Sequence, residues 1–377
     1  MAHNIEFNEK KGTYSFVEAN KSEIAWHRLG KRFDQDGITA TDAIVACNAD
    51  FQVSKQPIVA LTPEILDKMA NGEPITSAML EEQLISGKMA TMRLDQNKTL
   101  GIVSEHYGIV QNQDAFRFVD AIVSGSVDGQ SETPCIDCAG LLGNGERIFV
   151  TAKFPTPIVL DNKTGDQIDL YLVFTTSHDG SGAVNAMVTP IRVVCNNTLN
   201  LAFKENSGKL SMRHTSGIMS RLDLTNADNA TMALKSLNLY TQYRKTFAEK
   251  IAQLRSIKVT DKQAKEVMAL VTLPTAQLDI YRKTNDLFAE GISSRSRNLY
   301  QASIKSLYEG IGQGVEEGNG LWLVNGISTL YQNHTNNDTT KNGTKMFDSI
   351  TSGKISEKVN EVMNIIFALN TANALSH

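Results

Sequence analysis

The sequence predicts an α+β fold, with an antiparallel sheet and helices in its N-terminal part and a mainly helical C-terminal part. Three observations lead to this prediction. Up to about residue 200, short runs rich in β-branched and aromatic residues alternate with turn residues, as half-buried strands do. These runs follow one another as a meander, which favours antiparallel pairing. Beyond about Thr225, apolar residues recur at helical spacing with few Gly or Pro between them.

The first elements begin at clear start signals. A helix is expected over 39–49, because Thr39 can cap its first turn. Residues 51–60 alternate between apolar and polar, and they predict a strand. Thr62 then provides the cap of another helix, with Pro63 in its first turn, where a missing N–H costs nothing.

The middle of the chain is expected to supply most of the sheet. Strands are predicted over 101–110, 146–154, 168–176 and 183–194. A helix over 112–124 presents Phe116 and Val119 to the core. The residues that follow Cys135 and Cys138 read as a strand that runs into a turn, so we interpret this C-x-x-C as two ordinary thiols.

The C-terminal part is expected to consist of packed helices. Apolar residues from Ala230 to Leu254 predict a long helix, and Thr260 with Gln263 forms a capping box for the next. Further helices are predicted over 294–311, 321–333 and 356–369. We therefore divide the chain into an α+β domain, residues 1–222, and a helical region, residues 223–377, that packs on it or extends it.

Composition excludes several classes of protein. The chain has 377 residues with 37 Lys+Arg and 41 Asp+Glu, an ordinary globular composition with a net charge of −4. It has no run of eighteen apolar residues and no apolar segment after its start, so we expect neither a membrane span nor a secretory signal. Only four cysteines are present, as expected in a reducing compartment. We expect a cytoplasmic protein.

One short segment carries groups that could do chemistry. Ser177, His178 and Asp179 are followed by Gly180 and Ser181, between two predicted strands. A hydrolase needs a nucleophile held against a base, and neighbouring residues of a strand or turn point in different directions. A hairpin loop with local turn hydrogen bonds is the other interpretation. Phosphate-binding and zinc-hydrolase motifs are absent from the sequence, so we assign no catalytic residue, metal ligand or cofactor.

Charge is unevenly distributed along the chain. Residues 192–266 contain thirteen Lys and Arg against six acidic residues, while the remainder of the chain is acidic. A phosphate backbone would be attracted to this segment, and Tyr240 lies among its charges where it could stack on a base. Alternatively, these cations form the solvated side of an amphipathic helix that docks on the acidic remainder. The sequence leaves both interpretations open.

Several motifs resemble a known family. The stretch PIRVVCNNTL at 190–199 is similar to that of phage/plasmid-like proteins that carry a domain of unknown function. Further similar stretches follow the same order, namely AWHRLG at 25–30, VSEHYGIVQNQDAF at 103–116, residues 139–154, residues 177–181, residues 213–215 and GLWLVNGISTLYQNH at 320–334. The resemblance covers most of the chain. It implies a protein of a phage, plasmid or prophage that works in the host cytoplasm.

A distant similarity to ring-forming single-strand annealing proteins of phages implies more. Those proteins are oligomeric and grip the nucleic-acid backbone with Arg and Lys. Our hypothesis is therefore a DNA-binding protein that acts in recombination or single-strand annealing as a homo-oligomer, without a cofactor. The residues expected to contact nucleic acid are Arg192, Lys204, Arg213, Arg221, Tyr240, Arg244 and Lys245. The alternatives are an interaction protein that modulates a host factor, for example in anti-defence, and a hydrolase that uses the Ser177–Asp179 loop.

Overall fold

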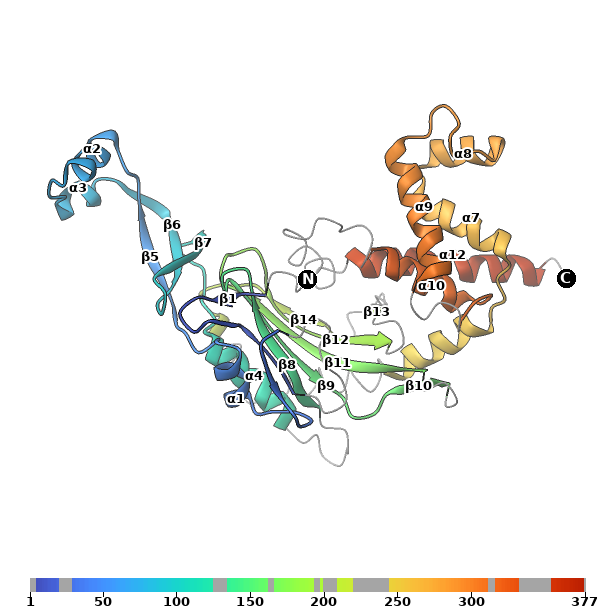
Figure 1. Cartoon of the computed structure of the whole chain (residues 1–377), viewed down its shortest axis with the longest axis horizontal. Coiled ribbons are helices and arrows are strands. Elements are labelled where there is room, and N and C mark those ends of the chain that lie inside the picture. The colour runs from blue at the N-terminus through green and yellow to red at the C-terminus, as the bar shows by residue number, and fades with distance from the viewer. Residues whose placement is uncertain are drawn as a thin grey trace.

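The computed structural model describes the chain as a central sheet with an arm on one side and a helical part on the other (Figure 1). The described residues are 5–19, 29–124, 134–161, 166–192, 197–198, 209–219, 244–310, 316–331 and 354–375. Within them, no helix is both long and apolar enough to cross a lipid bilayer.

The central sheet has nine strands. They are β3 (Phe16–Ala19), β4 (Lys31–Phe33), β8 (Cys135–Leu142), β9 (Arg147–Lys153), β10 (Ile158–Asp161), β11 (Asp166–Ser177), β12 (Val184–Arg192), β13 (Asn197–Thr198) and β14 (Lys209–Met212). Their order is β13-β12-β11-β9-β8-β3-β4, with β10 also paired to β11 and β14 to β12. Every pair is antiparallel except β3 with β4. A separate ladder joins β1 (Phe7–Asn8) to β2 (Thr13–Tyr14).

One face of the sheet is apolar because its strands alternate. On β9, Ile148, Val150 and Ala152 are fully buried, while the residues that alternate with them are half-buried. Helices α1 (Ala40–Ala46) and α4 (Asn112–Ser124) cover this face (Figure 1). Phe118 of α4 packs against Phe174 of β11, with 5.6 Å between the ring centroids. The other face carries the polar positions of the same strands.

A long arm projects from the sheet, away from the helical part (Figure 1). Its shaft is a three-stranded sheet in the order β5-β6-β7, made of β5 (Val53–Val59), β6 (Leu84–Arg93) and β7 (Lys98–Ser104). Its tip, residues 60–87, carries α2 (Pro63–Asn71) and α3 (Ser77–Glu81). We call residues 53–104 the arm and residues 60–87 the arm tip.

The helical part follows the sheet. Residues 244–256 are helical, and then come α7 (Asp261–Thr272), α8 (Thr275–Thr284), α9 (Ser294–Glu309), α10 (Gly320–Thr329) and α12 (Lys354–Leu375). Every residue of α10 is buried, so this helix forms the centre of the helical part. The α+β class, the antiparallel meander and the helical C-terminal part agree with the prediction from sequence. The predicted helix before residue 244 lies outside the described residues.

Buried groups join the helical part to the sheet. Arg255 donates a hydrogen bond to the carbonyl oxygen of Leu160 in β10 at 2.6 Å, and its Nε lies 3.1 Å from the fully buried carboxylate of Glu316. One cluster of buried apolar residues includes Val17 of β3 and Ile366 of α12. The predicted division at residue 222 lies between two described stretches, so it remains a prediction.

Candidate functional site

The residues expected to bind nucleic acid fall in three groups. Arg213, Arg244 and Lys245 lie in described segments, the first after β14 and the others at the start of the helical stretch 244–256. Arg192 ends β12 and pairs with Asn197 of β13 through its backbone. Lys204, Arg221 and Tyr240 lie outside the described residues. The structure therefore supplies side-chain positions for three of the seven.

The described residues of highest positive charge are 244–265, which we call the basic segment. It contains seven Lys and Arg and two acidic residues. Lys265 forms an ion pair with Asp261 at 2.8 Å within the same helix. Lys245 is exposed, and so is Arg213 outside the segment; neither forms an ion pair with any described residue. Their charges are therefore available to an anionic partner.

Arg255 belongs to the basic segment but has a structural role. Its guanidinium is held by the carboxylate of Glu316 and by the carbonyl oxygen of Leu160, as described above. Removing a partner from such a buried pair is costly, because the remaining charge loses its compensation. Arg255 therefore fits the alternative that cations of this segment dock on acidic residues of the same chain. It does not fit a phosphate contact.

The polar face of the sheet is charge-compensated. The ammonium group of Lys153 lies 2.7 Å from the carboxylate of Asp169, which is buried. On the same face, Arg32 pairs with Glu18 at 3.8 Å. An added phosphate would have to compete with these carboxylates. The basic segment and Arg213 are therefore the better candidates for contact with a phosphate backbone.

The segment from Ser177 to Ser181 forms part of a junction between the arm, α4 and the sheet. His178 is fully buried, and its Nε2 lies 2.7 Å from Oδ1 of Asn112. The side-chain amide nitrogen of Asn112, Nδ2, donates to the carbonyl oxygen of Ala49 at 2.9 Å. The other side-chain atom, Oδ1, is therefore an acceptor. Nε2 of His178 therefore carries the proton. Burial lowers the pKa of this imidazole to about 3, so the ring is neutral near pH 7.

Tyr107 and His214 complete this junction. The rings of Tyr107 and His214 stack with 4.6 Å between their centroids, and the hydroxyl of Tyr107 donates to the carbonyl oxygen of Ser177 at 2.6 Å. Nδ1 of His214 donates to the carbonyl oxygen of Gly108 at 2.9 Å, and burial lowers the pKa of this imidazole. We call Thr91, Tyr107, Asn112, His178 and His214 the arm junction. Thr91 belongs to it because its hydroxyl donates to the carbonyl oxygen of His178 at 2.6 Å.

The hydroxyl groups of this loop are occupied by turn hydrogen bonds. The hydroxyl of Ser177 accepts from the N–H of Gly182 at 3.0 Å, and the carboxylate of Asp179 accepts from the N–H of Ser181 at 2.9 Å. Asp179 also pairs with Arg147 at 3.7 Å. A neutral histidine with so low a pKa is a weak base, and its donating nitrogen is held by Asn112. This geometry favours the hairpin-loop interpretation over the hydrolase.

The C-x-x-C segment lies on β8. Cys138 contacts the hydroxyl of Thr151 at 2.9 Å, and burial raises the pKa of its thiol. The pKa of the Cys135 thiol is also raised, chiefly by burial. Thiols with raised pKa values carry little thiolate near pH 7 and are weak nucleophiles. Among the described residues, no three His, Cys, Asp or Glu side chains gather as a metal site.

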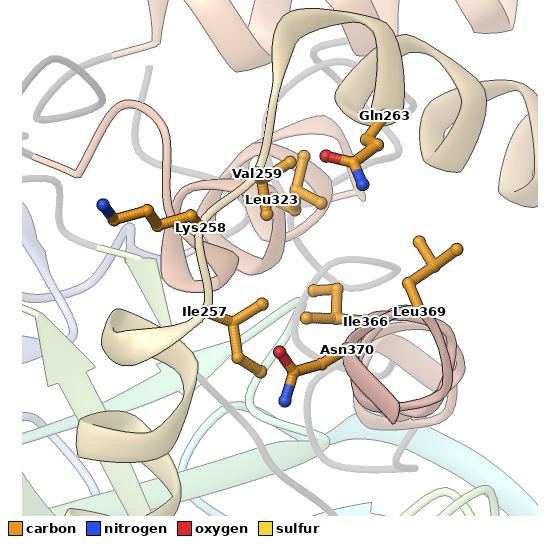
Figure 2. Close-up of a pocket in the computed structure, with 8 residues that line it drawn as sticks. All are labelled: Ile257, Lys258, Val259, Gln263, Leu323, Ile366, Leu369 and Asn370. Atoms are coloured by element: carbon orange, nitrogen blue, oxygen red, sulfur yellow. The ribbon is translucent and has the colours of Figure 1, made fainter. Parts of the chain in front are cut away.

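A small apolar pocket lies in the helical part, where α7, α10 and α12 meet (Figure 2). It is a shallow depression, partly open to solvent, and the space that it encloses is about enough for one water molecule. Its lining residues are Ile257, Lys258, Val259, Gln263, Leu323, Ile366, Leu369 and Asn370. Small-molecule sites usually enclose about 300–1,000 Å³ and hold convergent polar groups. This depression is therefore too small for a substrate, and its mainly aliphatic lining offers apolar surface against which an apolar side chain can rest.

Reasoning from sequence missed the arm and the pocket. The signal for the arm tip was present, because Leu66 and Met69 lie three residues apart on a helix beside polar residues. The arm junction gave no such signal, since His178 and Asn112 are 66 residues apart.

Comparison with known proteins gives one match. The family described as a domain of unknown function (DUF932) matches residues 99–351, about two thirds of the chain. The match begins in β7, so β5, α2, α3 and β6 precede it. The chain matches no curated protein. It matches no solved structure either.

Proposed function

The chain belongs to the DUF932 family, whose description names no activity, and from its geometry we propose that it is a nucleic-acid-binding protein. In this proposal it serves a phage or other mobile element in recombination or single-strand annealing. It works in the host cytoplasm as a homo-oligomer and needs no cofactor.

The exposed cations support this proposal. Arg213 and Lys245 are exposed and have no ion-pair partner among the described residues, and the basic segment has seven cations for two acids. Cations of this kind bind a phosphate backbone by releasing its counterions, which is independent of base sequence. Arg244, Arg192, Lys204 and Arg221 would extend the contact, and Tyr240 would stack on a base.

The experiment is a titration of the full-length protein with fluorescein-labelled oligothymidylate, followed by anisotropy at several salt concentrations. We expect an affinity that falls steeply with salt, by about 0.7 in the double-logarithmic slope for each phosphate neutralised. Lys245→Glu and Arg213→Glu should each lower that slope by about this amount and weaken binding. Lys98→Glu, on exposed β7 of the arm, makes the same charge change away from the proposed contact and should bind as the wild type does.

Two results would contradict the proposal. One is the absence of binding at low salt. The other is an unchanged slope in both Lys245→Glu and Arg213→Glu. In either case the interaction-protein alternative becomes the hypothesis to pursue, with capture of a host protein as its assay. A faster annealing of two complementary labelled strands by the wild type would extend the result from binding to annealing.

A further inference from the structure

The arm tip exposes apolar side chains that no other described residue of the chain covers. Leu66 and Met69 lie on one face of α2 and are 48% and 53% exposed. Ile65, at 1%, is the one buried residue in the fully described stretch 60–87. Exposed apolar groups that cluster on a projecting element mark an interaction surface.

The arm tip is also acidic. Residues 60–87 contain five acidic residues and one lysine, a net charge of −4. Two such tips would repel each other, which disfavours a symmetric contact between them. The surface that covers the tip should be basic and should offer an apolar depression.

The pocket between α7, α10 and α12 has these properties. Leu323, Ile366 and Leu369 line an aliphatic gap, and Figure 2 shows the side chain of Lys258 extending away from it at the edge. Lys258 lines the pocket, and Lys262 directly precedes the lining residue Gln263 in the sequence. Both lysines are exposed and form no ion pair with the described residues. An apolar gap with a basic rim complements an acidic tip with an apolar face.

The arm tip and the pocket lie at opposite ends of the molecule, so a chain cannot fill its own pocket (Figure 1). We infer that the arm tip of one copy docks on the helical part of a second copy, with Leu66 and Met69 resting against the aliphatic lining of the shallow pocket and acidic side chains facing Lys258 and Lys262. This inference deepens the oligomeric part of the proposed function and rests on it. Because the two surfaces differ, each copy offers one of each, and the contact generates rings or filaments.

The test is sedimentation velocity of the full-length protein over a range of concentrations. A tip variant carries Leu66→Asp and Met69→Asp, both at exposed positions. A pocket variant carries Asn370→Trp, which fills the mouth of the pocket from an exposed position. The control is Val45→Asp, an equally exposed apolar residue on α1. We expect the wild type and the control to assemble and both other variants to assemble at least about tenfold more weakly. Circular dichroism checks that each variant is folded.

Mixing the two variants gives the sharpest result. The pocket variant still has an intact tip and the tip variant an intact pocket, so an equimolar mixture should form a dimer and stop there. Salt should weaken assembly of the wild type, because the contact includes charge pairs. A double variant with Lys258→Glu and Lys262→Glu should lose assembly as the pocket variant does. Association should return when it is mixed with a second double variant whose arm tip carries Glu64→Lys and Asp67→Lys.

Three outcomes would overturn the inference, and they differ in what else they affect. If the wild type is monomeric at every concentration, the oligomeric part of the proposed function fails as well. The arm tip would then be a binding surface for a different protein. If the wild type assembles but both variants assemble equally well, the interface alone is wrong. If the mixture gives no dimer although each variant is folded, the contact is not between these two surfaces. Lys258 and Lys262 belong to the basic segment as well, so the oligothymidylate titration relies on Lys245→Glu and Arg213→Glu, which lie outside the proposed contact; nucleic-acid binding through those two residues can stand or fail independently.

Discussion

His178 is held neutral in the fold, which couples stability to pH. Burial lowers the pKa of its imidazole to about 3, whereas an exposed histidine titrates near 6.5. Between these values the unfolded chain binds a proton at this site and the folded chain does not, so this contribution is complete above about pH 6.5 and is lost as pH falls toward 3. We expect His178→Gln, which keeps an N–H for Asn112 and has no titrating ring, to show a flatter dependence in urea denaturation over this range.

The control for this prediction is His106→Gln. His106 lies on the loop before Tyr107, and its side chain is 84% exposed. Other groups titrate over the same pH range, so the quantity to compare is the difference between each variant and the wild type. A His178→Gln profile parallel to that of the wild type would show that His178 titrates in the folded chain as it does in water.

Arg93 makes a second buried connection between the arm and the body. Its side chain is fully buried at the end of β6, where it pairs with Glu6 near the N-terminus and with Asp95 at 2.8 Å. Its guanidinium also lies 3.9 Å from the ring centroid of Phe51. Arg93→Met leaves the buried Glu6 carboxylate without its cation, so we expect a loss of roughly 3–5 kcal/mol in the free energy of unfolding. Urea denaturation measures this loss, and the control Lys98→Met, at an exposed position, should change the stability little. If Arg93→Met is as stable as the wild type, the pair of Arg93 with Glu6 has no structural role.

At the scale of elements, the arm tip should be separable from the body. The main cluster of buried apolar side chains includes Val53 and Val110, but none of its buried members comes from the stretch of sequence between these two positions. Val59 and Leu84 are paired across the shaft, so an Asn-Gly turn can replace residues 60–83. We expect this deletion to leave the thermal unfolding of the body within about 1 kcal/mol of the wild type by circular dichroism, and to abolish self-assembly. Loss of the folded body would contradict it.

Local chemistry was sufficient to predict where many elements begin. Thr39, Thr62 and Thr260 were expected to cap helices, and each hydroxyl accepts an N–H from the first turn of α1, α2 or α7. The predicted helix over 112–124 has the bounds of α4. These signals lie within one helical turn, so neighbouring residues decide them.

Long-range arrangement could not be predicted in this way. The strand over 84–93 was not predicted, and nothing in the local sequence shows that β5, β6 and β7 form a sheet of their own, apart from the central sheet. The site followed the same rule. Exposed Arg213 and Lys245 were identified by charge alone, whereas the structural roles of Arg255 and His178 depend on partners far away in sequence.

At the scale of the whole molecule, the sheet and the helical part share their interior. The cluster of buried apolar side chains runs from Val17 in β3 to Ile366 in α12. Half-buried Arg255 and buried Glu316 add an ion pair beside β10. The sequence predicted a division near residue 222, and these connections indicate that the two sides of that division depend on each other for stability.

Calorimetry can test this dependence. Because the parts share one interior, we expect the full-length protein to unfold in a single transition whose calorimetric and van't Hoff enthalpies agree. Arg255→Met should lower the free energy of unfolding by roughly 1–3 kcal/mol, because Glu316 stays buried without its cation, while Arg255 is itself 31% exposed and Asn319 still donates to the carboxylate. The matched change is Arg282→Met, which breaks an exposed pair between α8 and Glu266 of α7 and should cost less than about 1 kcal/mol. Two resolved transitions in the wild type, with Arg255→Met affecting neither, would show instead that the helical region is an independent domain that only rests on the sheet.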